Sequence, residues 1–103
     1  MSKDAEFRVK IMTPEKIIFE GNVLFLNVPG EEGSLGILAH HPAFISTLVP
    51  GKITIGRKED KDQVVLRSSS AGFVGVGGNS VVILLDSFQT GTVGNKDPGY
   101  SRL

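Results

Sequence analysis

The chain has 103 residues, enough for one domain, and its eleven basic and eleven acidic side chains give a formal net charge of zero at pH 7. This balance gives no electrostatic basis for binding nucleic acid or an anionic membrane surface. The absence of cysteine excludes disulfides, thiolate metal sites and a cysteine nucleophile. The polar first residues predict no signal peptide, and no apolar run is long enough to span a bilayer.

The composition favours strands over helices. Thirteen glycines and five prolines fall often enough to interrupt any helix of ordinary length. Val and Ile dominate the aliphatic residues, and both favour pleated surfaces. The sequence therefore predicts an all-β domain: a flattened two-sheet β-sandwich of about nine to ten short strands, with turns every six to twelve residues.

The first strands follow from alternation. Residues 7–12 alternate apolar and polar side chains and predict a half-buried strand. The Thr13-Pro14-Glu15 stretch is a turn or the start of a helix, but only six residues separate Pro14 from Gly21, so a strand over 16–20 is favoured. Gly21-Asn22 is predicted to be a hairpin turn.

An acidic hairpin is predicted next. Glu31-Glu32-Gly33 separates two apolar runs, 23–28 and 35–38, and glycine supplies the positive φ that a tight turn requires. His40-His41-Pro42 then closes the second strand, because a residue before proline is pushed towards extended geometry.

The remaining strands are predicted over 43–49, 52–57, 63–67, 71–76 and 80–86, with a charged loop at 58–62 and a turn at 77–79. After Asp86 the pattern fails. Residues 1–86 are therefore expected to form the domain and residues 87–103 a flexible tail, whose last seven residues are either native or left by cloning.

The sequence predicts no chemistry of its own. The glycine run 72–78 fails the G-x-G-x-x-G pattern because Ser80 stands where the last glycine is needed. His40 and His41 are adjacent on an extended chain, so they converge poorly on one metal. The serine run 68–70 lacks the G-x-S-x-G elbow. No catalytic, cofactor-binding or metal-binding residue is predicted.

Three classes of function stay open on these residues. Leu24 and Leu26 beside Phe25 indicate apolar surface reserved for a neighbouring subunit. A free-standing β-sandwich that binds peptide or carbohydrate is the alternative, although the chain has no Trp and a single Tyr. A small hydrolase would require the serine run and a histidine to converge in space.

One family shares the order of these motifs. They are Thr13-Pro14-Glu15 with Phe19-x-Gly21, Val28-Pro29-Gly30-x-x-Gly33-x-Leu35-Gly36-Ile37-Leu38-x-x-His41, Pro50-Gly51, Ala71-Gly72-Phe73-Val74, and Asn79-x-Val81 running to Leu85-Asp86. Over about residues 7–86 the chain resembles the epsilon subunit of rotary ATP synthases, called delta in mitochondria.

The resemblance implies a role as well as a fold. It implies a β-sandwich at the foot of the central stalk, gripping the gamma subunit and resting on the ring of c subunits. Such a subunit is a non-catalytic part of the rotor, which couples ring rotation through gamma to ATP synthesis in the catalytic head. The expected location is peripheral, on the cytoplasmic face of a bacterial or equivalent energy-transducing membrane.

The resemblance also implies two contact sites. Glu31, Glu32, Gly33 and Ser34 correspond to the loop that faces the c-ring, and Ser34 replaces a usual acid. Thr13, His41 and Ser46 fall where the family meets gamma, and the apolar Leu24 and Leu26 are added to that contact. His40 occupies a usual glycine position, which costs energy if the backbone there has positive φ.

Many family members continue into a pair of carboxy-terminal helices that inhibits ATP hydrolysis and, in some bacteria, binds ATP. Only 17 residues follow Asp86 here, and three of them are glycines, too few and too flexible for two helices. The chain is therefore expected to lack this hairpin, whether it ends here naturally or was shortened.

Overall fold

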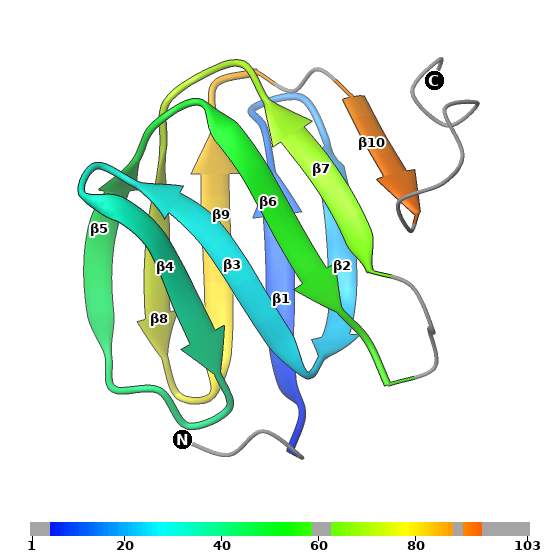
Figure 1. The fold of residues 1–103 in the computed structure, drawn as a ribbon, viewed down its shortest axis with the longest axis vertical. Coiled ribbons are helices and arrows are strands. Elements are labelled where there is room, and N and C mark those ends of the chain that lie inside the picture. Colours follow the sequence, from blue (N-terminus) through cyan, green and yellow to red (C-terminus); the bar gives the residue numbers. More distant parts are fainter. Residues whose placement is uncertain (1–4, 59–62, 88–89, 94–103) are drawn as a thin grey trace.

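The structure, a computed structural model, describes residues 5–58, 63–87 and 90–93, and these residues form strands, turns and bends without a helix. Figure 1 shows the ten strands in the described ranges. They are β1 (Phe7–Met12), β2 (Ile17–Val23), β3 (Phe25–Gly30), β4 (Gly33–Leu38), β5 (Phe44–Leu48), β6 (Gly51–Gly56), β7 (Val64–Ser68), β8 (Gly72–Gly77), β9 (Ser80–Leu85) and β10 (Thr90–Val93). Among the described residues no helix is long and apolar enough to cross a membrane.

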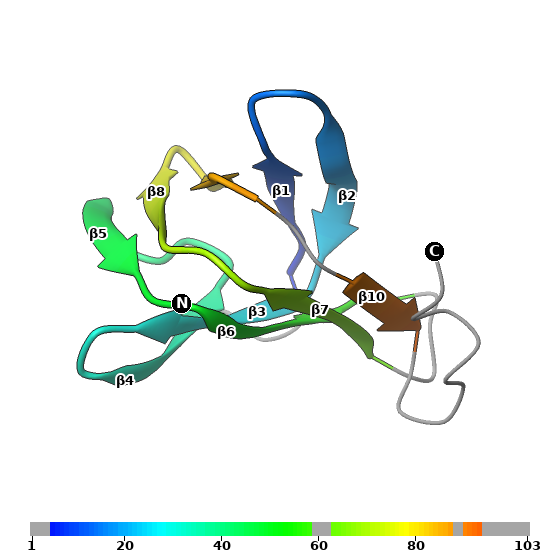
Figure 2. The same ribbon diagram turned by 90° about the horizontal axis from the view of Figure 1, so that it is seen from above.

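The strands form two packed layers. Sheet I has the order β5-β8-β9-β1-β2, and sheet II has the order β4-β3-β6-β7-β10. Figure 2 shows the two layers facing each other. A single paired position, Gly30 with Leu48, joins β3 to β5 and makes the hydrogen bonding continuous from one sheet to the other. The predicted two-sheet β-sandwich is therefore confirmed.

The core lies between the two sheets and is built from alternate residues of both. In β1, for example, Phe7, Val9 and Ile11 are at most 3% exposed, whereas Arg8 is exposed. The same alternation in β9 buries Val81, Ile83 and Leu85. Among the residues whose burial is described, eighteen buried apolar side chains make one continuous cluster, which is enough to hold a domain of this size without disulfides or metals. These residues are Phe7, Val9, Ile11, Val23, Leu26, Val28, Ile37, Ala39, Leu48, Ile53, Ile55, Val64, Leu66, Val74, Val76, Val81, Ile83 and Leu85.

The turn predicted at Gly21-Asn22 is wrong. β2 runs through both residues, because Gly21 pairs with Val9 and Asn22 with Arg8 in an antiparallel ladder. The chain instead turns at Leu24, whose N–H donates a hydrogen bond of 2.7 Å to the Gly56 carbonyl. This bond holds the chain where it passes from sheet I to sheet II. It joins residues far apart in sequence, so the local turn residues do not predict it.

The segment expected to be a tail begins with structure. Thr90–Val93 forms β10, which pairs antiparallel with β7 and extends sheet II. Threonine and valine favour strands, and this preference prevails over the neighbouring Gly91. Residues 94–103, like the tip of the charged loop at 59–62, lie outside the described residues.

Candidate docking surface

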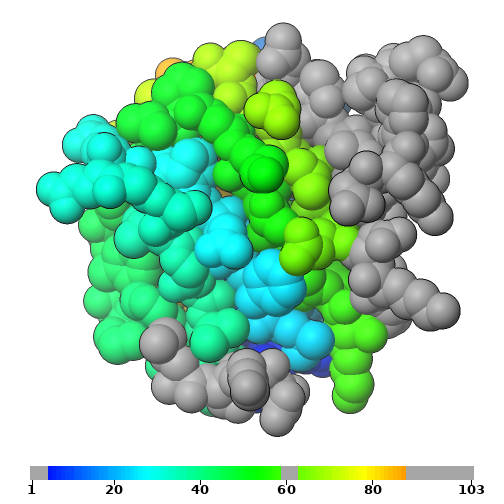
Figure 3. Space-filling model, viewed as in Figure 1, coloured from blue at the N-terminus to red at the C-terminus, as the bar shows by residue number. Residues whose placement is uncertain are grey.

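The β3–β4 hairpin carries the acidic tip. Glu31 and Glu32 are exposed between the paired Gly30 and Gly33. Gly33 has φ +124°, and a Cβ on Gly30 would stand 2.9 Å from the Gly33 carbonyl oxygen, so glycine is required on both sides of the turn. Figure 3 shows this tip, in cyan, projecting from the body of the molecule.

The acidic tip is anchored at its base to the other sheet. The Val49 N–H donates a hydrogen bond of 2.9 Å to the Pro29 carbonyl. One residue further, Gly30 pairs with Leu48 of β5. Two consecutive residues of the hairpin are therefore fixed to sheet I, which holds the two carboxylates at one end of the sandwich.

The outward face of sheet I exposes large apolar side chains. Residues directly opposite each other on paired strands point to the same face, so Thr47, Phe73, Leu84 and Met12 form one row across β5, β8, β9 and β1. Phe73 is 54% exposed and Leu84 48%.

A second row crosses the same face. Ile45, Gly75, Val82 and Lys10 lie opposite one another on the same four strands. Ile45 is 82% exposed, and Val82 39%. The exposed apolar side chains of the two rows, Ile45, Phe73, Val82 and Leu84, make an apolar patch between Thr47 and Lys10, and such a patch in soluble proteins marks a contact surface.

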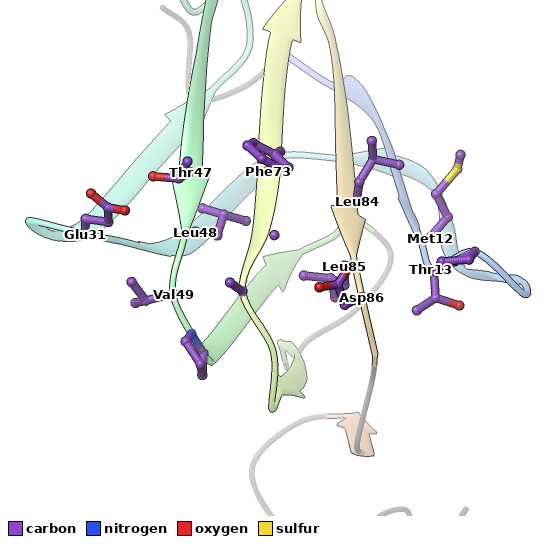
Figure 4. Close-up of a pocket in the computed structure, with 14 residues that line it drawn as sticks. Met12, Thr13, Glu31, Thr47, Leu48, Val49, Phe73, Leu84, Leu85 and Asp86 are labelled. Carbon is purple, nitrogen blue, oxygen red and sulfur yellow. The ribbon is translucent and has the colours of Figure 1, made fainter.

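A shallow groove of about 690 Å³ joins this patch to the acidic tip. It lies where β1, β5 and β9 end and β8 begins. Figure 4 shows Glu31 on one side, Thr13 on the other and Phe73 between them. Thr13 and Glu31, which the resemblance assigns to two different partners, thus line opposite sides of one groove.

Thr13 organises the turn between β1 and β2. Its N–H donates to the Lys16 carbonyl at 2.9 Å, and its Oγ1 accepts a bond of 3.3 Å from the Glu15 N–H. The prediction of a turn rather than a helix start is therefore confirmed. Because the hydroxyl oxygen is engaged in the turn, the side chain helps to shape the rim of the groove.

The two histidines lie at the opposite end of the sandwich. His40 has φ +64°, so the extended chain expected at this residue is wrong, and its N–H donates to Asn79 Oδ1 at 2.8 Å. His41 Nδ1 lies 2.8 Å from the Pro42 carbonyl oxygen, to which it donates, and its ring is 5.1 Å from the Phe44 ring between centroids. His41 is half-buried, so part of its surface is available to a partner.

Three residues expected to contact gamma are less exposed than that role requires. Leu26 has no exposed surface and belongs to the core, so its assignment as a contact residue is corrected. Leu24 is half-buried at the crossing between sheets. Ser46 pairs with the buried Val74 and shares its face, so it points inward and is half-buried.

The outward residues of β5 are Ile45 and Thr47, on either side of Ser46. Strand alternation in the sequence shows that these two share a face, but nothing local shows that this face is the solvent side. The sequence analysis therefore missed Ile45 as an exposed contact residue. Its exposure can be inferred only when the pairing of β5 with β8 is known.

The structure keeps the serine run and the histidines apart. Ser70 Oγ donates to the Ser87 carbonyl at 3.1 Å and accepts from the Ser87 N–H at 3.0 Å, at the end of the sandwich where β7 and β9 finish. The histidines lie beside the β8–β9 turn at the other end. Within the described part of the chain, no three His, Asp or Glu side chains are grouped as metal ligands.

Comparison with known sequences gives a consistent result. The family model of the ATP synthase delta/epsilon chain beta-sandwich domain matches residues 6–91. Among curated relatives, the ATP synthase epsilon chain of Protochlamydia amoebophila is 37% identical over 84 residues, and that of Leptospira interrogans 42% identical over 81 residues. These matches cover 82% and 79% of this chain but 56% and 61% of the relatives, so the chain spans little more than half of their length.

Solved structures show the same fold. A chain of the Euglena gracilis mitochondrial ATP synthase, solved as OSCP/F1/c-ring, matches with a TM-score of 0.70 at 23% identity, over 86% of this chain and 54% of its own length. A chain from the central stalk/c-ring of the Tetrahymena thermophila mitochondrial enzyme matches with a TM-score of 0.60 at 24% identity, over 84% of this chain and 67% of its own.

Proposed function

This chain belongs to the ATP synthase delta/epsilon family through its beta-sandwich domain, and from that premise we propose that it is a non-catalytic subunit of the rotor. In this role it binds the gamma subunit, rests on the c-ring, and couples ring rotation to ATP synthesis in the catalytic head. Through that complex it is peripheral to the cytoplasmic face of a bacterial or equivalent energy-transducing membrane.

One observation carries the proposal: an exposed apolar face and an acidic tip meet at the same end of a rigid sandwich. The face of sheet I offers Ile45, Phe73 and Leu84, each about half exposed or more. The tip offers two solvent-facing carboxylates, Glu31 and Glu32. A rotor subunit between a shaft and a ring needs two such surfaces held in a fixed relation.

The apolar face suits the gamma subunit. A stable contact buries about 800 Å² on each partner, and the centre of such a contact is apolar and dry. The molecule measures 35 × 28 × 25 Å along its principal axes, which leaves room for a patch of that size on sheet I. Thr13 lies at one end of this face, and His41 lies at the other end of the sandwich, at the mouth between the two sheets.

The acidic tip suits the c-ring. Exposed carboxylates add little stability each, because solvent and salt screen them. Such charges give a contact its register and its discrimination between partners. Polar or basic loops at the surface of the ring are therefore the proposed partner of Glu31 and Glu32.

Titration of the purified gamma subunit of the same ATP synthase tests the proposal, with Ile45→Asp as the probe. Ile45 is 82% exposed, so its replacement should leave the free energy of unfolding within about 0.5 kcal/mol. Burial of an isoleucine contributes about 1.5–3 kcal/mol, and an unpaired carboxylate in the contact adds a further penalty. Calorimetry should therefore show at least tenfold weaker binding of gamma.

Gln63→Asp is the matched control, because it adds the same single negative charge at an exposed position beside sheet II. It should bind gamma as the unmodified chain does. Equal affinity of the Ile45→Asp variant, or a chain that never associates with gamma, would contradict the proposal.

A free-standing module for carbohydrate or peptide receives no comparable support. Of the 14 residues that line the groove, Phe73 is the only aromatic one. Sugar and peptide sites rely on several aromatic side chains around a few placed polar groups. The family assignment points to a subunit of the ATP synthase instead.

A further inference from the structure

The middle of β8 presents backbone, not side chains, to the outside. Gly75 lies opposite Ile45 on β5 and opposite Val82 on β9, and all three positions face outward. A Cβ placed on Gly75 would have no atom within 4 Å. Gly77, the next outward position, would bring its Cβ no closer than 3.8 Å to Ala43. A glycine inside a strand often marks a place where another backbone approaches closely.

These residues form what we call the β8 channel: Gly75 and Gly77 as its floor, Ile45 and Val82 as its walls, and Phe73 at one end. Adjacent strands are about 4.8 Å apart, so the backbones that carry the two walls lie about 10 Å from each other, and the wall side chains fill part of that space. An α-helix with its side chains is about 10–12 Å across. A helix therefore rests on the two walls and places one row of its side chains over the glycine floor.

The occupant must bind through its side chains. β8 is paired along both edges, with β5 on one side and β9 on the other, so its backbone hydrogen bonds are already made and no strand can be added there. We propose that the β8 channel seats one α-helix of the gamma subunit, with a large apolar side chain of that helix placed over Gly75. This inference rests on the proposed function and specifies the structure of its contact.

The length and ends of the channel fit this occupant. The six residues of β8 extend over about 20 Å, the length of a helix of about 13 residues. Thr13 lines the groove at the Phe73 end. At the other end, His41 packs against Phe44 and lies beside the buried Val76, at the mouth between the two sheets. A helix lying along β8 thus reaches the Thr13 position assigned to gamma and continues the proposed interface.

The charges give the helix a direction. Glu31 and Asp86 border the groove at the Phe73 end. At the opposite end of this face, Arg8 stands across from Ser80 and forms an ion pair of 3.3 Å with Glu20, which balances its charge. A helix has a positive amino end, so its amino-terminal turn and basic side chains belong beside the two carboxylates.

Gly75→Leu tests the channel directly, because it fills the space reserved for the partner's side chain. The site is open and its φ lies outside the positive range, so the unfolding transition in urea should change little. Binding of gamma should weaken at least tenfold. Gly36→Leu is the matched control: it adds the same side chain to the outward face of β4 in sheet II, where its Cβ meets only the flexible end of Asn27, and gamma binding should persist.

The outcomes separate the two proposals. If the unmodified chain binds gamma and Gly75→Leu binds it equally well, the channel is refuted and the proposed function stands. If both glycine variants lose binding equally, the channel is also refuted. If the unmodified chain does not bind gamma, both proposals fail.

Cross-linking tests the shape of the occupant. The chain has no cysteine, so Gly75→Cys offers one defined attachment point for a short photoreactive probe. In the complex with gamma, labelled positions spaced three or four residues apart would support a helix. Positions two residues apart, or cross-links to a second copy of this chain, would overturn it.

Discussion

The Phe25 ring occupies the space where a side chain of residue 56 would begin, and this contact makes a sharp prediction about stability. The two residues are paired across β3 and β6. A Cβ added to Gly56 would stand only 2.0 Å from Phe25 Cε2, 2.5 Å from Cδ2 and 2.6 Å from Cζ. No real Cβ comes so close to a carbon atom, so in Gly56→Ala the whole ring must move.

The expected destabilisation follows from two opposing terms. Forcing a packed side chain out of its place costs about 1–3 kcal/mol. Replacing glycine with alanine also restricts the unfolded chain, which stabilises the fold by about 0.4–1 kcal/mol. The net loss in the free energy of unfolding should be about 1–2 kcal/mol. For a domain of this size, each kcal/mol lost lowers Tm by about 4–8 °C.

A double-mutant cycle followed by circular dichroism in urea identifies the cause. Phe25→Ala alone removes the ring, and in that background Gly56→Ala should be neutral or stabilising. A loss of the same size with and without the ring would refute the steric explanation. A loss that appears as a changed slope rather than a changed midpoint would also argue against it, because the slope reports the surface exposed on unfolding.

Two further predictions concern the ends of the sandwich. Asn79→Ala should lower the free energy of unfolding, measured by urea titration, by about 2–4 kcal/mol. Alanine is strained at φ +59°, and the hydrogen bonds of the Asn79 side chain with the His40 N–H and the Glu6 carbonyl are lost. Asn79→Gly should recover about 1 kcal/mol of this loss, and no recovery would show that backbone strain plays no part. The double variant Glu31→Gln with Glu32→Gln should bind the isolated c-ring more weakly and with less salt dependence, and it should bind gamma normally. Unchanged binding of the c-ring across a salt series would refute the acidic tip as the contact with the c-ring.

Most of the fold could be predicted from local patterns. Alternation located β1 to the residue, and the stretch of glycine and glutamate located the β3–β4 hairpin. These features depend on neighbours along the chain, which a sequence displays directly.

The rest depends on partners distant in sequence. Asn79 joins His40, 39 residues away, to Glu6, 73 residues away, and no local signal announces such a link. The orientation of β5 is a similar case, since Ser46 and Ile45 exchange faces if the strand rotates by one position. The sequence places Leu26 at the surface because the β3 segment is apolar on both faces. Only the pairing of Leu26 with Ile37 and Ile55 shows that it belongs to the core.

The backbone links between the two sheets determine how a load on the acidic tip is transmitted. Beside the acidic tip, backbone joins the two sheets through the Gly30–Leu48 pair, the bond from Val49 to Pro29 and the β5–β6 connection at Val49 and Pro50. A sideways load on the tip would enter sheet II and reach sheet I as shear across the interlocked apolar layer between them. Close-packed interiors transmit strain, so the apolar layer passes such a load from sheet II to sheet I.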